Sequence, residues 1–106
     1  MEKWDTKITK ELAEAICALK SKQEAKKFLR DLLTPQEIIE FGKRWQAARM
    51  LSKNMSYSKI EKETGLSSTT VARVSRWLNQ GMGGYKLMIN RLANEHHHNQ
   101  TLTGRE

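Results

Sequence analysis

Apolar side chains recur at helical spacing along most of this 106-residue chain, and this pattern limits the fold more than any other feature of the sequence. Residues three and four positions apart share one face of an α-helix, so each such run predicts an amphipathic helix. No segment shows the sustained alternation and β-branched enrichment that are typical of strands. The expected fold class is therefore all-α.

The apolar pattern predicts six helices. Their expected ranges are about 5–19, from Ser21 to the boundary at Thr34, 35–52, two short helices within 56–79, and about 85–92. The boundary before the third helix is the sharpest: Thr34 can cap free amide groups, Pro35 suits the first helical position, and Glu37 completes a capping box. Residues 1–93 are expected to form one domain, and the polar residues 94–106 a disordered tail.

The segment 56–79 has the residue spacing of a helix-turn-helix. Gly65 lies between its two short helices and can supply the positive φ that the tight turn needs. Ser67 or Ser68 can cap the second helix. The apolar residues expected to pack between the two helices and beneath them are Ile60, Leu66, Val71, Val74 and Leu78.

The positive charge of the chain is concentrated in the same region. The whole chain has a net charge of +7, and residues 43–76 contain eight basic and two acidic side chains, a net charge of +6. Excess positive charge favours polyanions, with nucleic acid first and acidic membranes or proteins second. Together with the helix-turn-helix spacing, this charge predicts double-stranded DNA as the partner.

Individual roles follow from the usual docking of a helix-turn-helix, with its second helix in the major groove and its first across the backbone. Short hydroxyl side chains at the start of the second helix allow close approach to base edges, and an arginine one turn later can reach a guanine or a phosphate. The residues predicted to read bases are Ser68, Thr69, Thr70 and Arg73. The residues predicted to contact the DNA backbone are Tyr57, Ser58, Lys59, Lys62 and Arg76.

Several stretches of the sequence resemble the Trp-repressor superfamily, in particular its YerC/YecD-like branch of predicted transcriptional regulators. In chain order, they are Leu32–Glu37, Gly42–Arg44, Ile60–Gly65, Thr69–Arg73, Arg76–Asn79 and Gly84–Tyr85. The resemblance covers roughly 12–92, and its specificity lies in the joint order and spacing of these pieces. It implies an intertwined all-α homodimer that binds a pseudo-palindromic operator and acts as a transcriptional regulator, with repression as the expected outcome.

The same resemblance implies a candidate effector pocket. The Trp repressor binds its amino-acid corepressor between two arginines, and these resemble Arg44 and Arg73 here. The family pattern then requires a glycine after the second arginine, whereas this sequence has Val74. A branched side chain should fill the space of the indole ring, so tryptophan is not expected as the effector. Arg44 is then expected to make an intersubunit or a phosphate contact.

The remaining features favour neither an enzyme nor a membrane protein. No nucleophile, acid–base pair or preorganised metal-ligand set emerges, and the histidines at 96–98 suggest only adventitious metal binding. The lack of a long apolar run or a signal-peptide pattern, together with a single cysteine at Cys17, predicts a cytoplasmic protein. The alternative function is a helical interaction module that binds an acidic protein partner without reading DNA. An RNA-binding role is disfavoured because exposed aromatic residues are expected to be few.

Overall fold

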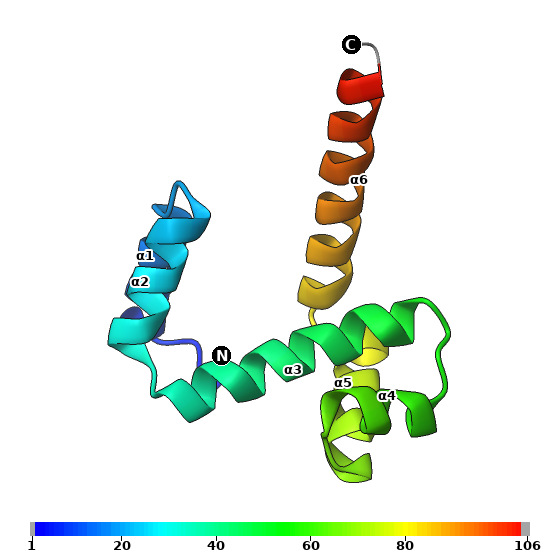
Figure 1. Ribbon diagram of the computed structural model, residues 1–106. Coiled ribbons are helices and arrows are strands. Elements are labelled where there is room, and N and C mark those ends of the chain that lie inside the picture. Colours follow the sequence, from blue (N-terminus) through cyan, green and yellow to red (C-terminus); the bar gives the residue numbers. More distant parts are fainter. Residues whose placement is uncertain (1, 105–106) are drawn as a thin grey trace. The chain divides into compact units, whose positions relative to one another are not determined.

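The computed structural model describes the backbone of residues 2–104 and the side chains of residues 2–95. The described chain is all-α, as predicted, and its helices are α1 (Lys7–Cys17), α2 (Lys22–Leu32), α3 (Pro35–Ser52), α4 (Tyr57–Thr64), α5 (Ser68–Gln80) and α6 (Gly84–Gly104) (Figure 1). The chain divides into two compact units, and the boundary between them falls within α3, after Ile38. No helix among the described residues is both long and apolar enough to cross a membrane.

Hydroxyl side chains begin the two helices of the first unit. Thr6 Oγ1 accepts a hydrogen bond from the amide of Thr9 at 3.2 Å at the start of α1. Ser21 Oγ accepts one from the amide of Glu24 at 3.1 Å at the start of α2. The Glu24 carboxylate accepts a hydrogen bond from the amide of Lys20 at 2.9 Å. In a standard capping box it would accept from the amide of the cap residue, Ser21, which is one residue later.

The capping box predicted at the start of α3 is confirmed. The amide of Thr34 donates to Glu37 Oε1 at 2.9 Å, and the amide of Glu37 donates to Thr34 Oγ1 at 3.1 Å. Hydrogen bonding to Thr34, through its backbone first and its side chain second, lowers the pKa of Glu37. The bond that the Thr34 amide donates to Oε1 favours the ionised carboxylate, so this helix start depends on pH.

The first unit has no buried residue in α1 or in α2. Ile8 and Ile16 lie on the apolar side of α1 and are 78% and 53% exposed. Cys17 on the same helix is also exposed. Within the first unit, α2 therefore leaves much of the apolar side of α1 exposed.

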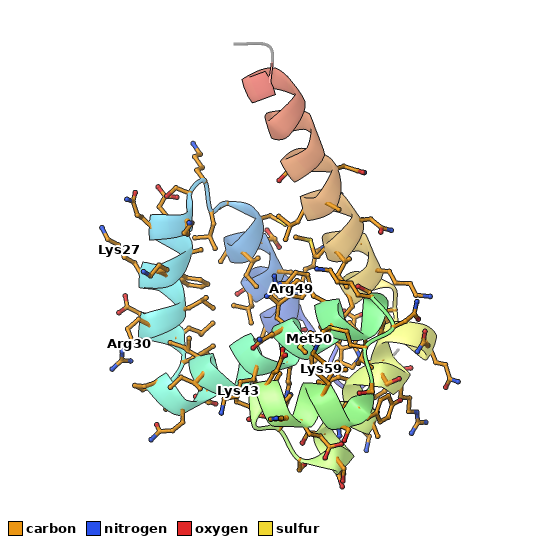
Figure 2. The ribbon with its side chains drawn as sticks, turned by 45° about the vertical axis from the view of Figure 1, so that its right-hand side comes forward. Lys27, Arg30, Lys43, Arg49, Met50 and Lys59 are labelled. Atoms are coloured by element: carbon orange, nitrogen blue, oxygen red, sulfur yellow. The ribbon has the colours of Figure 1, made fainter. Side chains whose placement is uncertain are left out.

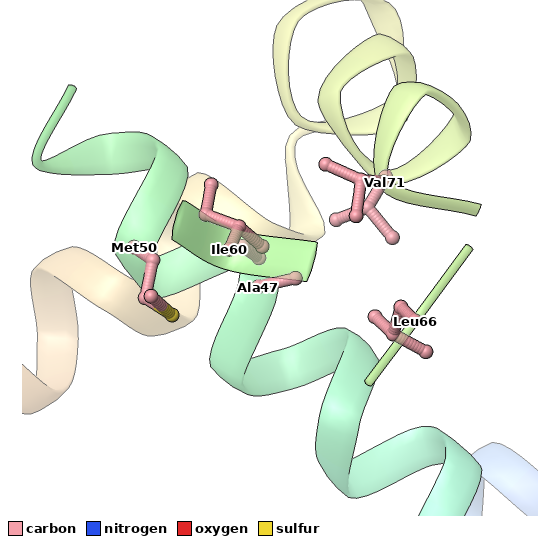
Figure 3. Packing of buried hydrophobic residues seen from close by; sticks show 7 residues of the cluster. Ala47, Met50, Ile60, Leu66 and Val71 are labelled. Carbon is pink, nitrogen blue, oxygen red and sulfur yellow. The ribbon is translucent and has the colours of Figure 1, made fainter. Parts of the chain in front are cut away.

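The second unit has a small core beneath the helix-turn-helix (Figure 3). Ala47 and Ala48 on α3 are fully buried and present only methyl groups, which lets the neighbouring helices approach closely. The other buried apolar residues of this unit are Met50, Ile60, Leu66, Val71, Val74 and Leu78. This set contains all five residues that the helix-turn-helix spacing predicts to be buried.

Serine residues also cap the two helices of the helix-turn-helix. Ser56 Oγ accepts from the amide of Lys59 at 3.2 Å at the start of α4. Ser67 Oγ accepts from the amide of Thr70 at 3.2 Å at the start of α5. Of the two serines that the sequence left open for α5, Ser67 is the cap, and Ser68 is the exposed first residue of the helix.

The last helix extends beyond its expected end. The sequence predicted a helix from Tyr85 to about Leu92, whereas the described backbone is helical from Gly84 to Gly104. No proline or glycine lies between these two glycines, so no residue there removes a donor or strongly disfavours the helix. The disorder predicted for 94–106 and the single domain predicted for 1–93 stay predictions.

We expect Ser67→Ala to lower the free energy of unfolding by about 1 kcal/mol, because the amide of Thr70 loses its acceptor. The matched variant Ser68→Ala should change it by less than about 0.5 kcal/mol, since no cap is removed there. Urea unfolding followed by circular dichroism measures both variants. Equal losses in the two variants would contradict the assignment of the cap.

We expect Glu37 to make the stability of the chain depend on pH. Its pKa is lower in the folded than in the unfolded chain, so its contribution is present above the unfolded pKa and is lost as the pH falls through the folded pKa. Between about pH 6 and about pH 3, the melting temperature of the wild type should therefore fall more than that of Glu37→Gln. Parallel curves for the two proteins would contradict this role.

Candidate nucleic-acid interface

The turn between α4 and α5 is held by hydrogen bonds within the chain. Gly65 ends α4 with φ 76°, as predicted, and its amide donates to the carbonyl of Glu61 at 2.8 Å. The buried hydroxyl of Thr64 donates to the carbonyl of Ile60 at 2.7 Å and accepts from the amide of Leu66 at 3.2 Å. These bonds satisfy the backbone groups at the turn and fix the direction in which α5 leaves it.

The apolar face of α5 determines which of its side chains face outward. Val71, Val74 and Leu78 are buried and share one side of the helix, because they lie three and four residues apart. The opposite side is therefore exposed. The exposed residues of α5 between Ser68 and Trp77 are Ser68, Thr69, Ala72, Arg73, Arg76 and Trp77.

Three of the four residues predicted to read bases lie on this exposed side. Ser68, Thr69 and Arg73 are exposed, and they lie within the first two turns of α5. Thr70 is only half exposed, and its hydroxyl lies 3.1 Å from Ser67 Oγ. The Thr70 side chain therefore takes part in the cap of the helix and lies at the margin of the exposed side.

A hollow of about 330 Å³ lies on the exposed side of α5. It is lined by Thr69, Ala72, Arg73, Arg76 and Trp77. The hollow brings together three predicted contact residues with two that the sequence analysis did not select, Ala72 and Trp77. The signal that could have found them is the spacing 69, 72, 73 and 76, which places these positions side by side on a helix.

A second hollow, of about 610 Å³, lies along α4. It is lined by Ser56, Ser58, Lys59, Lys62 and Glu63. Three of the predicted backbone contacts therefore lie on one concave surface, and Lys59 can be seen in Figure 2. Of the other two, Arg76 lines the hollow on α5, and Tyr57 lines a separate hollow of about 520 Å³ formed with α3, α5 and α6.

Lys43 on α3 brings a further positive charge to the turn (Figure 2). A methyl group added at Gly65 would lie 3.8 Å from Lys43 Nζ, so this ammonium group reaches the end of α4. The carbonyl groups at a helix C-terminus favour a cation in this position. Lys43 belongs to the basic region 43–76 but is not among the residues predicted to contact DNA.

No cation of the two hollows forms an ion pair within 4.0 Å with a described acidic side chain. Among the described side chains, the ion pair within 4.0 Å is that of Arg44 with Glu40, at 3.2 Å on α3. Lys59, Lys62 and Arg73 are therefore free to bind an anion. The guanidinium of Arg76 lies 5.7 Å from the centre of the Trp77 ring, which positions it without neutralising it.

The two arginines of the candidate effector pocket have different surroundings. Arg44 is half-buried, pairs with Glu40, and has its guanidinium carbon 5.6 Å from the centre of the Phe41 ring. Arg73 is exposed on α5. Val74, which follows it, is only 2% exposed and packs into the core, so the position that the family pattern gives to glycine is filled.

The described residues contain no cluster of three potential metal ligands. The histidines at 96–98, for which the sequence suggested only adventitious metal binding, lie outside the residues whose side chains are described. The candidate interface therefore consists of cations, hydroxyl groups and apolar side chains.

Comparison with known proteins gives consistent matches. The chain matches the model of the Trp repressor protein family over residues 7–93. The uncharacterized protein YerC of Bacillus subtilis (strain 168) is 40% identical over 82 residues, which are 77% of this chain and 79% of YerC. The structure of a TrpR-like protein from Eubacterium eligens ATCC 27750 has a TM-score of 0.81 and 37% identity, and covers 86% of this chain and 94% of that one.

A further solved structure, of a candidate Trp repressor from Staphylococcus aureus, has a TM-score of 0.81 and 31% identity, and covers 88% of this chain and 96% of that one. These matches confirm the Trp-repressor-like fold and the resemblance to YerC. The family consists of non-enzymatic regulators, which confirms that the chain is not an enzyme. Because the family match spans most of its length, the chain belongs to the Trp repressor family.

Proposed function

We propose that this protein is a sequence-specific DNA-binding transcriptional regulator that acts in the cytoplasm as a repressor. The observation that carries the proposal is the exposed side of α5, with Ser68, Thr69 and Arg73 directed away from the core beside the fixed turn at Gly65. Small hydroxyl groups allow a helix to approach base edges, and the arginine supplies donors for guanine or phosphate. Membership of the Trp repressor family supports the same function.

The two hollows have different proposed roles, phosphate binding on α4 and base recognition on α5. The hollow on α4 offers Lys59 and Lys62 to phosphate groups, together with the hydroxyl of Ser58. Contacts of this kind fix the position of the protein on the duplex and make binding depend on salt. The exposed side of α5 then reads the sequence, with Arg76 as a further backbone contact. Tyr57, which lies apart from these residues, has the weakest support among the proposed contacts.

The proposed active form is a homodimer in which the first unit supplies much of the interface. The apolar side of α1, with Ile8 and Ile16, is exposed in the single chain. A chain of this size buries only part of its apolar surface by itself, and a large exposed apolar patch marks an interaction site. Two copies related by a two-fold axis would present two α5 helices to half-sites roughly 34 Å apart on a pseudo-palindromic operator.

Tryptophan is not the proposed effector. The buried side chain of Val74 fills the position after Arg73, and a well-packed core resists the displacement of a branched side chain. Arg44 already pairs with Glu40 within its own helix. We propose an intersubunit or phosphate contact for the remaining donors of Arg44.

The proposed roles of Arg73 and Lys59 predict different effects on binding. Arg73→Ala should weaken binding to a duplex selected from a random pool by about 1–3 kcal/mol and leave random DNA little affected. Lys59→Ala should weaken both duplexes alike and reduce the salt slope by about one. Fluorescence anisotropy at several salt concentrations measures both effects.

A matched control for these variants is Lys26→Ala, which removes one cation from α2 in the first unit and should leave the affinity for both duplexes and the salt slope unchanged. If both interface variants lose equally on selected and random DNA, the assigned roles are wrong. If the wild type binds random duplex DNA without a salt slope, the alternative of an acidic protein partner is favoured.

The proposed dimer predicts that Ile8→Glu disrupts association, because the charge would be placed on the apolar side of α1. Sedimentation equilibrium should give the wild type twice the mass of the 12.3 kDa chain and give this variant the mass of one chain. The control Lys10→Glu changes an exposed residue on the other side of the same helix and should remain dimeric. A monomeric wild type at micromolar concentration would contradict the proposal.

A further inference from the structure

The hollow on α5 has an apolar floor between two cations. Ala72 contributes a methyl group to its lining, and Thr69 and Arg76 lie three and four residues away from Ala72 on the same face, with Arg73 beside it in the sequence. The hollow exists because alanine is short and the side chains around it are long. Its volume of about 330 Å³ is many times the roughly 30 Å³ that a water molecule occupies, so it has room for the edge of a base.

The orientation of this floor is fixed by the core. Val71 precedes Ala72 and Val74 follows it two positions later; both valines are buried, so Ala72 faces outward as long as α5 is packed. Trp77 closes one side of the hollow with an indole ring that is 51% exposed. The guanidinium of Arg76 lies 5.7 Å from the centre of that ring, which reduces the freedom of both side chains.

The chemistry of the lining selects among the four bases. In the major groove, thymine presents a methyl group beside an acceptor oxygen, guanine presents two acceptors, adenine presents an acceptor and a donor, and cytosine presents a donor. The methyl groups of Thr69 and Ala72 suit an apolar group, and the guanidinium groups of Arg73 and Arg76 suit acceptors. No acidic side chain lines the hollow that could accept from cytosine. Thymine is the base whose edge matches both parts of this lining.

We propose that the hollow around Ala72 is a subsite for the 5-methyl group of thymine, so that Ala72 determines sequence specificity together with the predicted base-reading residues. The subsite rests on the proposed function, since it requires α5 to lie in a major groove. It specifies one base, thymine, and one chemical group, its 5-methyl group, that the protein recognises.

Replacing single thymidines by deoxyuridine tests the subsite, because this change removes the methyl group and nothing else. The duplex is first selected from a random pool with the full chain, and each thymine of a half-site is then replaced in turn. At one position, the wild type should lose about fourfold in affinity, the effect of exposing one buried methyl group. Ala72→Ser, which places a hydroxyl in the hollow, should reduce this loss to less than about twofold.

The matched control is Ala93→Ser, which makes the same change at an exposed position of α6 and should keep the fourfold loss. The ratio of thymine to uracil affinity is taken within each variant, so a change in the fraction of folded protein cancels. The subsite is overturned if the selected half-sites contain no thymine, if no replacement weakens the wild type, or if Ala72→Ser keeps the full loss. A wild type that does not prefer the selected duplex to a scrambled one overturns the proposed function itself.

Discussion

The packing of α4 against α5 is the interaction on which the helix-turn-helix depends, and Ala47 and Ala48 of α3 complete its buried core. Ala47 and Ala48 present only methyl groups, so Ile60 and Val71 come close enough to be fully buried. This contact sets the rotation of α5 about its own axis. Because the rotation is set, hydroxyl, alanine and arginine side chains form one exposed surface, and any change in the core would redirect that surface.

Local chemistry made much of the fold predictable. The boundary at Thr34, the turn at Gly65 and a serine cap on α5 were all visible, because each depends on residues within four positions of one another. The buried residues of the helix-turn-helix followed from helical spacing. The length of α6 was not predictable in this way, since no residue there forbids a helix and none marks its end.

The candidate site was only partly predictable, for a different reason. The sequence identifies hydroxyl and charged side chains directly as candidates for binding DNA. Lys59, Lys62 and Arg73 lie on the predicted helices. The proposed role of Ala72 could not be predicted from its residue type, because it depends on a short side chain standing among longer neighbours. The bond of the Thr70 hydroxyl to Ser67 was also hidden, since a threonine in this position can equally face outward.

The two units differ in where their apolar contacts come from, and this difference affects their response to dilution. The unit that contains the helix-turn-helix has a core supplied by one chain. The helices α1 and α2 contain no buried residue of their own, so if a second copy covers them, their order follows mass action. Lower abundance in the cell would then loosen this half first and separate the paired reading helices, while each helix-turn-helix keeps its shape.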